Sequence, residues 1–253
     1  SSLRVKNKYG QSNVFLDYVG YRIFDGRLPL GDLPSADADE NTQTLEISLI
    51  DNLTNLSVKL YYTVFPDSDV ISRYAVYENN GESALTIEKS MSLTVDLDNC
   101  DFDMISFYGN WDNERNFERY HIRHGLQSVY SRRGMSSHTL NPFFALVSPD
   151  CDENKGHAYG FNFVYSGNFL SEVEVDHLNH TRVQIGLGDE KFSWLLEKGE
   201  SFITPEAVMT YTENGYGQMS RNFHKFIRKH ILPPEPFNCR PVVINPWEAV
   251  WFD

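Results

Sequence analysis

The sequence is poor in cysteine and in basic side chains, and each shortage excludes a class of protein. Its 3 cysteines, Cys100, Cys151 and Cys239, form no Cys-x-x-Cys pair. A disulfide-stapled secreted scaffold is therefore excluded, and a reduced, cytoplasmic compartment is expected. Against 35 acidic side chains there are only 22 basic ones, a net charge of -13. Because nucleic acids and anionic membrane surfaces are bound through lysine and arginine, we expect neither as a partner.

Long apolar runs are also absent. None approaches the ~18 residues that a membrane-spanning helix needs. The opening SSLRVKNKYG has no signal-peptide core, and it begins at once with strand-like residues. The chain nevertheless has enough apolar side chains for a packed interior, since 41% of its 253 residues are hydrophobic and 14% are aromatic. One large domain or two small ones are expected.

Apolar residues recur at every second position along most of the chain. In the run 56–64, Leu56, Val58, Leu60, Tyr62 and Val64 should share one apolar face. Comparable runs are TLEISLID, VISRYAVYEN, ALTIEKSMSLTVDL, NPFFALVSP, HAYGFNFVYSG, LSEVEVDHL, TRVQIGLG, KFSWLLEKG and SFITPEAVMTYT. Strands at this spacing, separated by clusters of Asn, Gly, Asp and Pro, predict an all-β fold: a large antiparallel β-sandwich.

A single helix is predicted, over residues 216–232. Its apolar positions, Met219, Phe223, Phe226, Ile227 and Ile231, follow helical spacing, and most of its basic residues fall on the other face. The following PPEPF ends the helix, because proline cannot continue a helix interior. We therefore place the sandwich at residues 1–214, a helix and proline-rich linker at 215–239, and an apolar strand of a different kind at 240–253.

The motifs that suggest metal binding or nucleophilic catalysis fail on inspection. Asp37, Asp39 and Asn41 alternate as in an EF-hand loop, but Thr42 stands where glycine is needed and Ser48 where glutamate is needed. GMSSH, at 134–138, lacks the context of a nucleophile elbow. The eight histidines lack His-Glu-x-x-His spacing and are expected at the surface. We therefore expect no metal or other cofactor, and no pair among the 35 carboxylates is marked out as catalytic.

The segment YGNWDNERNFERY combines Trp111 with Arg115 and neighbouring acidic residues. Composition alone favours a salt-bridged loop with a partly buried tryptophan. The alternative is a contact with a sugar or a protein partner, because an indole face packs on a pyranose ring while nearby charges bond its hydroxyl groups.

Four stretches, taken in order, resemble the α-galactosidases of glycoside hydrolase family 36. DYVGYRIFDGRLPLGDLPSA is similar to a tyrosine-rich strand with a Gly-Leu-Pro loop, and GNWDNER to the family's G-x-W-x-x-E-R. SRRGMSSHTLNPFFAL and RPVVINPWEAVWFD are similar to R-G-x-S-S-H-x-x-N-P-F and R-P-x-x-I-N-x-W-E-A-x-x-F-D. Pro246 and Trp251 depart from the family, which more often has asparagine and tyrosine there.

The resemblance implies a β-supersandwich, a linker helix and the first strand of a (β/α)₈ barrel. It implies a retaining hydrolase that releases terminal α-linked galactose from melibiose- or raffinose-type oligosaccharides. Its two barrel aspartates include a nucleophile in a Lys-Trp-Asp-type motif, which this sequence lacks. We therefore expect the chain to be inactive alone, to lack early strands of the sandwich, and to assemble as a homo-oligomer, a tetramer in many family members.

The resemblance also suggests substrate-binding residues. Trp247 matches the tryptophan that lines the galactose pocket at the end of the first barrel strand, where barrel active sites lie. A plain interdomain tryptophan is the alternative. Asp253 ends the same motif, and Trp111 and Arg115 belong to the sandwich motif, which together with residues 25–35 could reach a neighbour's pocket. Without barrel partners, residues 245–253 are expected to be the least native-like part of the chain.

Two other functions remain open from the sequence. One is a stand-alone carbohydrate-binding sandwich without hydrolase activity, with Trp111 as its aromatic platform. The other is a pure assembly module, which would bind no sugar.

Overall fold

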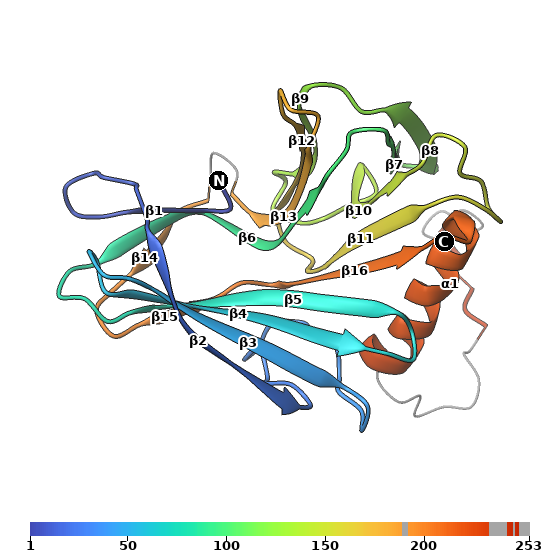
Figure 1. Cartoon of the computed structure of the whole chain (residues 1–253). Coiled ribbons are helices and arrows are strands. Elements are labelled where there is room, and N and C mark those ends of the chain that lie inside the picture. Colours follow the sequence, from blue (N-terminus) through green and yellow to red (C-terminus); the bar gives the residue numbers. More distant parts are fainter. Residues whose placement is uncertain (189–191, 233–241, 245, 248–253) are drawn as a thin grey trace.

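The computed structural model describes residues 1–188, 192–232, 242–244 and 246–247, and within them it forms two antiparallel β-sheets and one helical segment (Figure 1). The smaller sheet has the strand order β1 (Leu3–Lys6), β6 (Leu85–Leu97), β13 (Thr181–Leu187), β12 (Phe169–Val175) and β9 (Gly125–Ser131), with β14 (Trp194–Leu196) also paired to β6.

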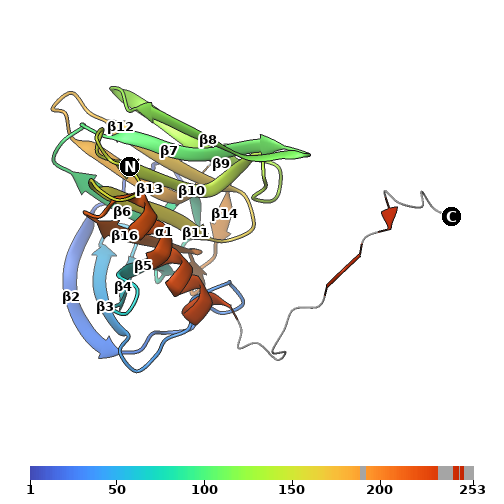
Figure 2. The same ribbon diagram turned by 90° about the vertical axis from the view of Figure 1, so that its right-hand side faces the viewer.

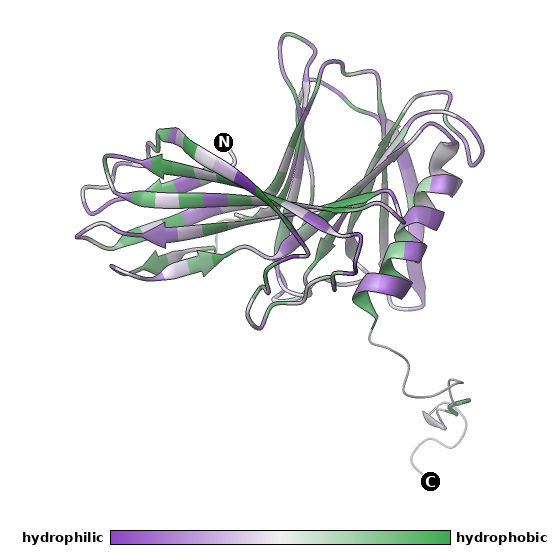
Figure 3. Ribbon diagram, turned by 60° about the horizontal axis from the view of Figure 1, so that its bottom comes forward, coloured by the Kyte–Doolittle hydropathy of each residue, from purple (hydrophilic) through white to green (hydrophobic). Residues whose placement is uncertain are grey.

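The larger sheet has the order β2 (Leu16–Asp25), β3 (Gln43–Asp51), β4 (Leu56–Phe65), β5 (Val70–Asn79), β16 (Glu206–Thr212), β11 (Ala158–Val164), β10 (Leu140–Val147), β7 (Asp103–Asn110) and β8 (Asn113–His121), with β15 (Ser201–Ile203) also paired to β5. Hydrophilic and hydrophobic residues alternate along many of these strands (Figure 3). The predicted sandwich is confirmed, and its period-two pattern is the reason.

The main core lies between the two sheets. Val173 and Val183 of the smaller sheet belong to the same buried cluster as Phe144 and Phe161 of the larger one. The rings of Phe144 and Phe161 stack with centroids 5.0 Å apart. All four side chains are fully buried. This cluster removes a large apolar area from water, which is the main favourable term in folding.

The larger sheet is covered on both faces, and this contradicts the alternation predicted for residues 56–64. In β4, Leu56 and Val58 are buried as predicted, but further along Tyr61 and Phe65 are buried and Val64 is exposed. Leu56 and Val58, at the beginning of the strand, pack toward the smaller sheet. Tyr61 and Phe65, in the second half of the strand, are buried on the opposite face of the sheet. Tyr61 packs against the segment after β2, and Phe65 packs against the helix. The prediction of one continuous apolar face over residues 56–64 was therefore wrong.

Helix α1 (Gly215–Phe226) lies across β16, β11 and β5 and continues as the π-helical η1 (Ile227–Ile231) (Figure 2). Met219, Phe223 and Phe226 are buried, as their spacing predicted. His230 continues the 4-3-4 spacing of these residues and is also buried, at 2% exposure. The expectation of surface histidines was therefore wrong for His230.

A glycine on β11 fixes how closely the helix approaches the sheet. A Cβ atom on Gly160 would lie 2.6 Å from a ring carbon of Phe223 and 2.7 Å from the sulfur of Met219. Both neighbours are themselves buried, so they have little room to move.

We therefore expect Gly160→Ala to displace α1 and to lower the free energy of unfolding by about 1–3 kcal/mol. Gly20→Ala is the matched control, because a Cβ on this strand glycine meets nothing within 4 Å. Urea titration followed by circular dichroism measures both variants. Equal stability of the two would contradict the tight contact.

Candidate functional site

The connection between β2 and β3, residues 26–42, is held by a buried ion pair. Nη1 of Arg27 lies 2.8 Å from Oε1 of Glu206 on β16, and the two side chains are 5% and 0% exposed. The second carboxylate oxygen of Glu206 accepts a hydrogen bond from the Ala36 amide at 2.7 Å, and Arg27 donates to the Ala36 carbonyl at 2.6 Å. One carboxylate thus binds two positions of the same connection and closes it into a compact loop.

Aromatic packing supports this ion pair. The rings of Tyr61 and Tyr74 stack with centroids 4.7 Å apart, and Leu30 from the connection is buried with them. The Arg27 guanidinium lies 6.0 Å from the centre of the Tyr74 ring. Burial raises the pKa of Tyr74 to about 12. Burial and a hydrogen bond to Glu46 raise the pKa of Tyr61. Both phenols therefore stay neutral at physiological pH.

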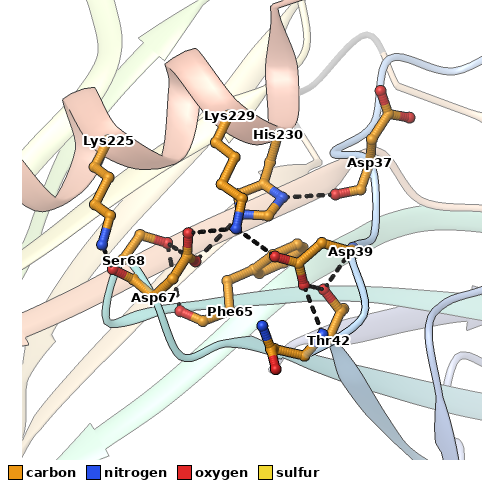
Figure 4. A network of polar contacts seen from close by, with 10 residues as sticks. Asp37, Asp39, Thr42, Phe65, Asp67, Ser68, Lys225, Lys229 and His230 are labelled. Atoms are coloured by element: carbon orange, nitrogen blue, oxygen red, sulfur yellow. Dashed lines mark hydrogen bonds and ion pairs between the residues drawn. The ribbon is translucent and has the colours of Figure 1, made fainter.

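The far end of the connection is held by a polar clamp, which we define as Asp39, Asp67, Lys229 and His230 (Figure 4). Nζ of Lys229 lies 2.5 Å from Oδ2 of Asp39 and 2.9 Å from Oδ2 of Asp67. Nε2 of His230 lies 3.2 Å from Oδ1 of Asp67, and its Nδ1 lies 2.8 Å from the Asp37 carbonyl. The clamp joins η1 to the β2–β3 connection and to the β4–β5 turn.

The charges of the clamp decide what it can do chemically. The hydrogen bond from Lys229 holds the pKa of Asp39 well below its usual range. Burial alone would raise the pKa of Asp67, but hydrogen bonds from Lys229 and His230 outweigh burial and lower it. Neither carboxyl group is protonated near neutral pH, so neither can act as a general acid.

Asp39, Asp67 and His230 also have the geometry of a possible cation site, since one ligand atom of each lies within 4.8 Å of the others. The Lys229 ammonium already supplies a positive charge to both carboxylates. A metal ion would have to displace that ammonium, whose pKa these carboxylates raise. The clamp is therefore a structural contact between three segments.

A hollow of about 790 Å³ opens beside the same connection. Asp32 and Leu33 lie on one side of it, and aromatic side chains including Tyr165, Phe192 and Trp194 line it. Trp194 is 49% exposed. The mixture of ring faces and polar groups could accommodate a sugar or a protein side chain.

The hairpin of β7 and β8 carries Trp111 and Arg115. Trp111 is 84% exposed at its tip, so the interpretation as a salt-bridged loop with a partly buried tryptophan was wrong about burial. Asp112 and Arg115 both have positive φ, at 61° and 57°. A Cβ on Gly109 would lie 2.6 Å from the Asn113 carbonyl oxygen, so glycine permits this close turn.

Arg115 lies in a separate groove of about 780 Å³ between this hairpin, β10 and helix α1. Phe107, Phe117 and Tyr216 contribute apolar surface to the groove, and Glu153 contributes a carboxylate. The groove therefore lies between the β7–β8 hairpin and helix α1, and no residue of the β2–β3 connection lines it.

The suggested site residues are not brought together within the described residues. The β2–β3 connection and the β7–β8 hairpin lie toward opposite edges of the larger sheet, which are eight strand spacings apart in its order. At ~4.8 Å per spacing, the path across the sheet is on the order of 40 Å. Trp247 is 51% exposed, and Asp253, like most of 245–253, lies outside the described residues.

Sequence reasoning missed Arg27, Glu206 and the clamp. Nothing local marks Glu206 for ion pairing, because its partner lies on a segment distant in sequence. His230 was recognisable in principle from its place on the apolar stripe of the helix.

Removing one member of the buried pair should be costly. We expect Arg27→Met to lower the free energy of unfolding by about 3–5 kcal/mol, because it leaves the Glu206 carboxylate buried without its counter-ion. The double variant Arg27→Met, Glu206→Gln should recover part of this loss. Urea unfolding of Arg27→Met, Glu206→Gln and the double variant gives the coupling free energy between the two side chains. Additive losses would show that the pair is not coupled.

The clamp should contribute stability over a defined pH range. The lowered pKa values of Asp39 and Asp67 mean that its contribution is present above their unfolded pKa of about 4 and is lost as pH falls through the folded values. The raised pKa of Lys229 means that its contribution is present below about pH 10 and is lost as pH rises through the folded value.

Lys229→Met should accordingly lower the Tm by a few degrees near neutral pH, with a smaller difference from the parent chain in strong acid. Lys198→Met is the control, because Lys198 pairs with Glu82 where both side chains are largely exposed. Thermal unfolding by circular dichroism across the pH range measures the differences. An unchanged Tm for Lys229→Met at neutral pH would show that the clamp contributes nothing.

Comparison with known proteins places this fold. The model of the glycosyl hydrolase family 36 N-terminal domain matches residues 1–197, and the melibiase model matches 201–253. Alpha-galactosidase AgaA of Geobacillus stearothermophilus is 42% identical over 254 residues, which cover 99% of this chain and 35% of that protein. Alpha-galactosidase C of Emericella nidulans is 39% identical over 100% of this chain and 34% of its own length.

The similarity extends to three dimensions. A crystal structure of an AgaA variant in complex with 1-deoxygalactonojirimycin matches 100% of this chain and 36% of that chain, at 42% identity and a TM-score of 0.96. In the part of the chain that the structure describes, no helix is long and apolar enough to span a membrane. The chain spans about a third of the length of the curated relatives named above. It belongs to glycoside hydrolase family 36, and its residues 1–197 are the family's N-terminal domain.

Proposed function

We propose that the chain is the non-catalytic N-terminal portion of an α-galactosidase that releases terminal α-linked galactose from oligosaccharides. The observation that carries this proposal is 42% identity to AgaA over 99% of the chain. Solved structures of AgaA variants hold raffinose and stachyose, which are oligosaccharides of the proposed substrate class. The proposed reaction is a retaining hydrolysis by two carboxylates of the barrel, outside this chain.

The proposed division of the chain is a sandwich at 1–214, a linker at 215–239 and the start of the barrel at 240–253. The beginning of α1 at Gly215 supports the first boundary. The strong exposure of Val242, Val243 and Ile244, between 80% and 96%, supports a partner surface for the last segment. We also propose a cytoplasmic location and a homo-oligomeric assembly, a tetramer.

In this proposal the sandwich supports the barrel and contributes to its surroundings. Trp247 forms an apolar wall of the galactose pocket, and Asp253 lies at the end of the same strand. Trp111 and Arg115, on the β7–β8 hairpin, contribute in this proposal to the galactose pocket of a neighbouring subunit. The separation of the β2–β3 connection from the β7–β8 hairpin supports this distribution of roles.

A chimera tests the proposal directly. This chain replaces the matching third of Geobacillus AgaA, and raffinose hydrolysis is measured alongside the isolated chain. We expect the chimera to hydrolyse raffinose and the isolated chain to show no turnover of an aryl α-galactoside. A chimera that folds by circular dichroism but leaves raffinose intact contradicts the proposal. So does turnover by the isolated chain that persists through purification.

In the active chimera, Trp247→Ala should raise the KM for raffinose about tenfold or more, because it removes the apolar wall of the sugar pocket. Tyr9→Ala, an exposed aromatic side chain between β1 and β2 that lines neither the hollow nor the groove described above, is the control and should leave the KM within about twofold.

The exposure of Trp111 supports a second candidate, a carbohydrate-binding sandwich that acts without a hydrolase. Calorimetric titration of the isolated chain with galactose, melibiose and raffinose separates the two. Saturable binding that disappears in Trp111→Ala would favour the binding module, whereas no binding favours the hydrolase portion.

A further inference from the structure

Several buried polar atoms under the β2–β3 connection have no hydrogen-bond partner in the protein. Among the described residues, seven buried side-chain nitrogen and oxygen atoms lack such a partner. Four of the seven belong to Arg27, Ser72, Tyr74 and Glu206, which lie where the connection covers the larger sheet. Native proteins satisfy nearly all buried polar atoms, so a group of four in one region requires a physical explanation.

Strand pairing places these side chains on one face of the sheet. Val208 of β16 lies opposite Ser72 of β5. Because side chains alternate along a strand, Glu206 shares the face of Val208, and Tyr74 shares the face of Ser72. Arg27 reaches this face from the connection and contacts Glu206. The four unpartnered atoms therefore come from neighbouring side chains in one layer of the domain.

The Arg27–Glu206 pair leaves bonding capacity unused on both partners. Nη1 of Arg27 donates to the Ala36 carbonyl at 2.6 Å, and Oε2 of Glu206 accepts from the Ala36 amide at 2.7 Å. The 2.8 Å contact of Nη1 with Oε1 is an ion pair without an aligned hydrogen bond. Nη2 therefore still has hydrogens to donate, and Oε1 still has lone pairs to accept a hydrogen bond.

The tyrosine beside the ion pair is in the same condition. Tyr74 is 2% exposed, and its hydroxyl group has no partner among the described residues. Its ring stacks on Tyr61 and lies 6.0 Å from the Arg27 guanidinium. Burial raises the pKa of Tyr74 to about 12, and the charges of Arg27 and Glu206 act on the same phenol in opposite directions. The hydroxyl is thus a neutral group close to both charges.

The chemistry of these atoms identifies the ligand that suits them. Nη2 of Arg27 can only donate a hydrogen bond, a carboxylate oxygen can only accept one, and a tyrosine hydroxyl can do either. A bound cation would be repelled by the guanidinium and a bound anion by the carboxylate. Water is neutral and both donates and accepts, and buried water typically makes about three such hydrogen bonds.

The hollow of about 790 Å³ provides a route for solvent to this region. Leu30 packs with Tyr74 and also lines the hollow. Pro205, the residue before Glu206, lines it as well. The hollow therefore reaches residues that flank the ion pair.

We propose that the Arg27–Glu206 pair binds internal water, which bridges Nη2 of Arg27 to Oε1 of Glu206 and to the Tyr74 hydroxyl group. Water is then a structural ligand that helps fix the β2–β3 connection to β16. This proposal is independent of the proposed enzymatic function, because every group that it uses is buried within this chain.

Removing the tyrosine hydroxyl group tests the bridge through the sign of its effect. Tyr74→Phe keeps the ring stacked on Tyr61 but removes one partner of the water, so the midpoint of urea unfolding should fall. A buried hydroxyl group without any partner is unfavourable, and its removal would leave the midpoint unchanged or raise it.

Tyr77→Phe is the matched reference. Tyr77 is equally buried, and its hydroxyl group lies 3.1 Å from the Ser90 hydroxyl oxygen, so its removal should lower the midpoint. A midpoint that falls in Tyr77→Phe but is unchanged or raised in Tyr74→Phe overturns the water bridge.

A crystal structure of the 253-residue chain, at a resolution that shows ordered water, tests the site directly. We expect a water oxygen at about 2.7–3.2 Å from Nη2 of Arg27, from Oε1 of Glu206 and from the Tyr74 hydroxyl oxygen. In Tyr74→Phe the water should remain between Arg27 and Glu206. A direct hydrogen bond between Nη2 and the carboxylate, with no water beside it, overturns the proposal.

Discussion

The buried pair of Arg27 and Glu206 is the contact on which the arrangement of this domain depends. Two charged groups removed from water are costly unless each compensates the other, and in this pair Nη2 of Arg27 has no hydrogen-bond partner among the described residues. Here the carboxylate also binds the Ala36 amide. The pair therefore fixes a 17-residue connection, 26–42, onto the central strand β16. The connection in turn covers the Tyr61 and Tyr74 rings and delivers Asp39 to the helix.

The covering of both faces of the larger sheet follows from this contact. A sheet in a simple sandwich has one buried face and one wet face, and its strands alternate accordingly. In this domain the smaller sheet buries one face over part of the area, and the connection with α1 buries the opposite face elsewhere. Glycine at position 160 lets the helix come close, and the polar clamp holds its last turns.

The sequence predicted the fold class, most strands and the helix, because those depend on local periodicity. The four ordered motifs predicted the family. Burial in the outer half of β4 could not be predicted, since it depends on which element covers which face. The ion pair of Arg27 with Glu206 was equally hidden, because its members come together only in the folded chain. For Trp111, composition could not distinguish a buried ring from an exposed one, whereas the hairpin geometry does.

The place of β16 in the larger sheet has a consequence for how the chain reaches its fold. This strand is the last of the sheet to be synthesised, yet it lies between β5 and β11 near the middle. Until Glu206–Thr212 inserts, the sheet consists of two separate halves, each with an open edge. Such edges favour association between incomplete chains, and long-range pairing is slow to form. The closing strand carries Glu206 itself, so the sheet is joined and the β2–β3 connection is fixed in the same late step.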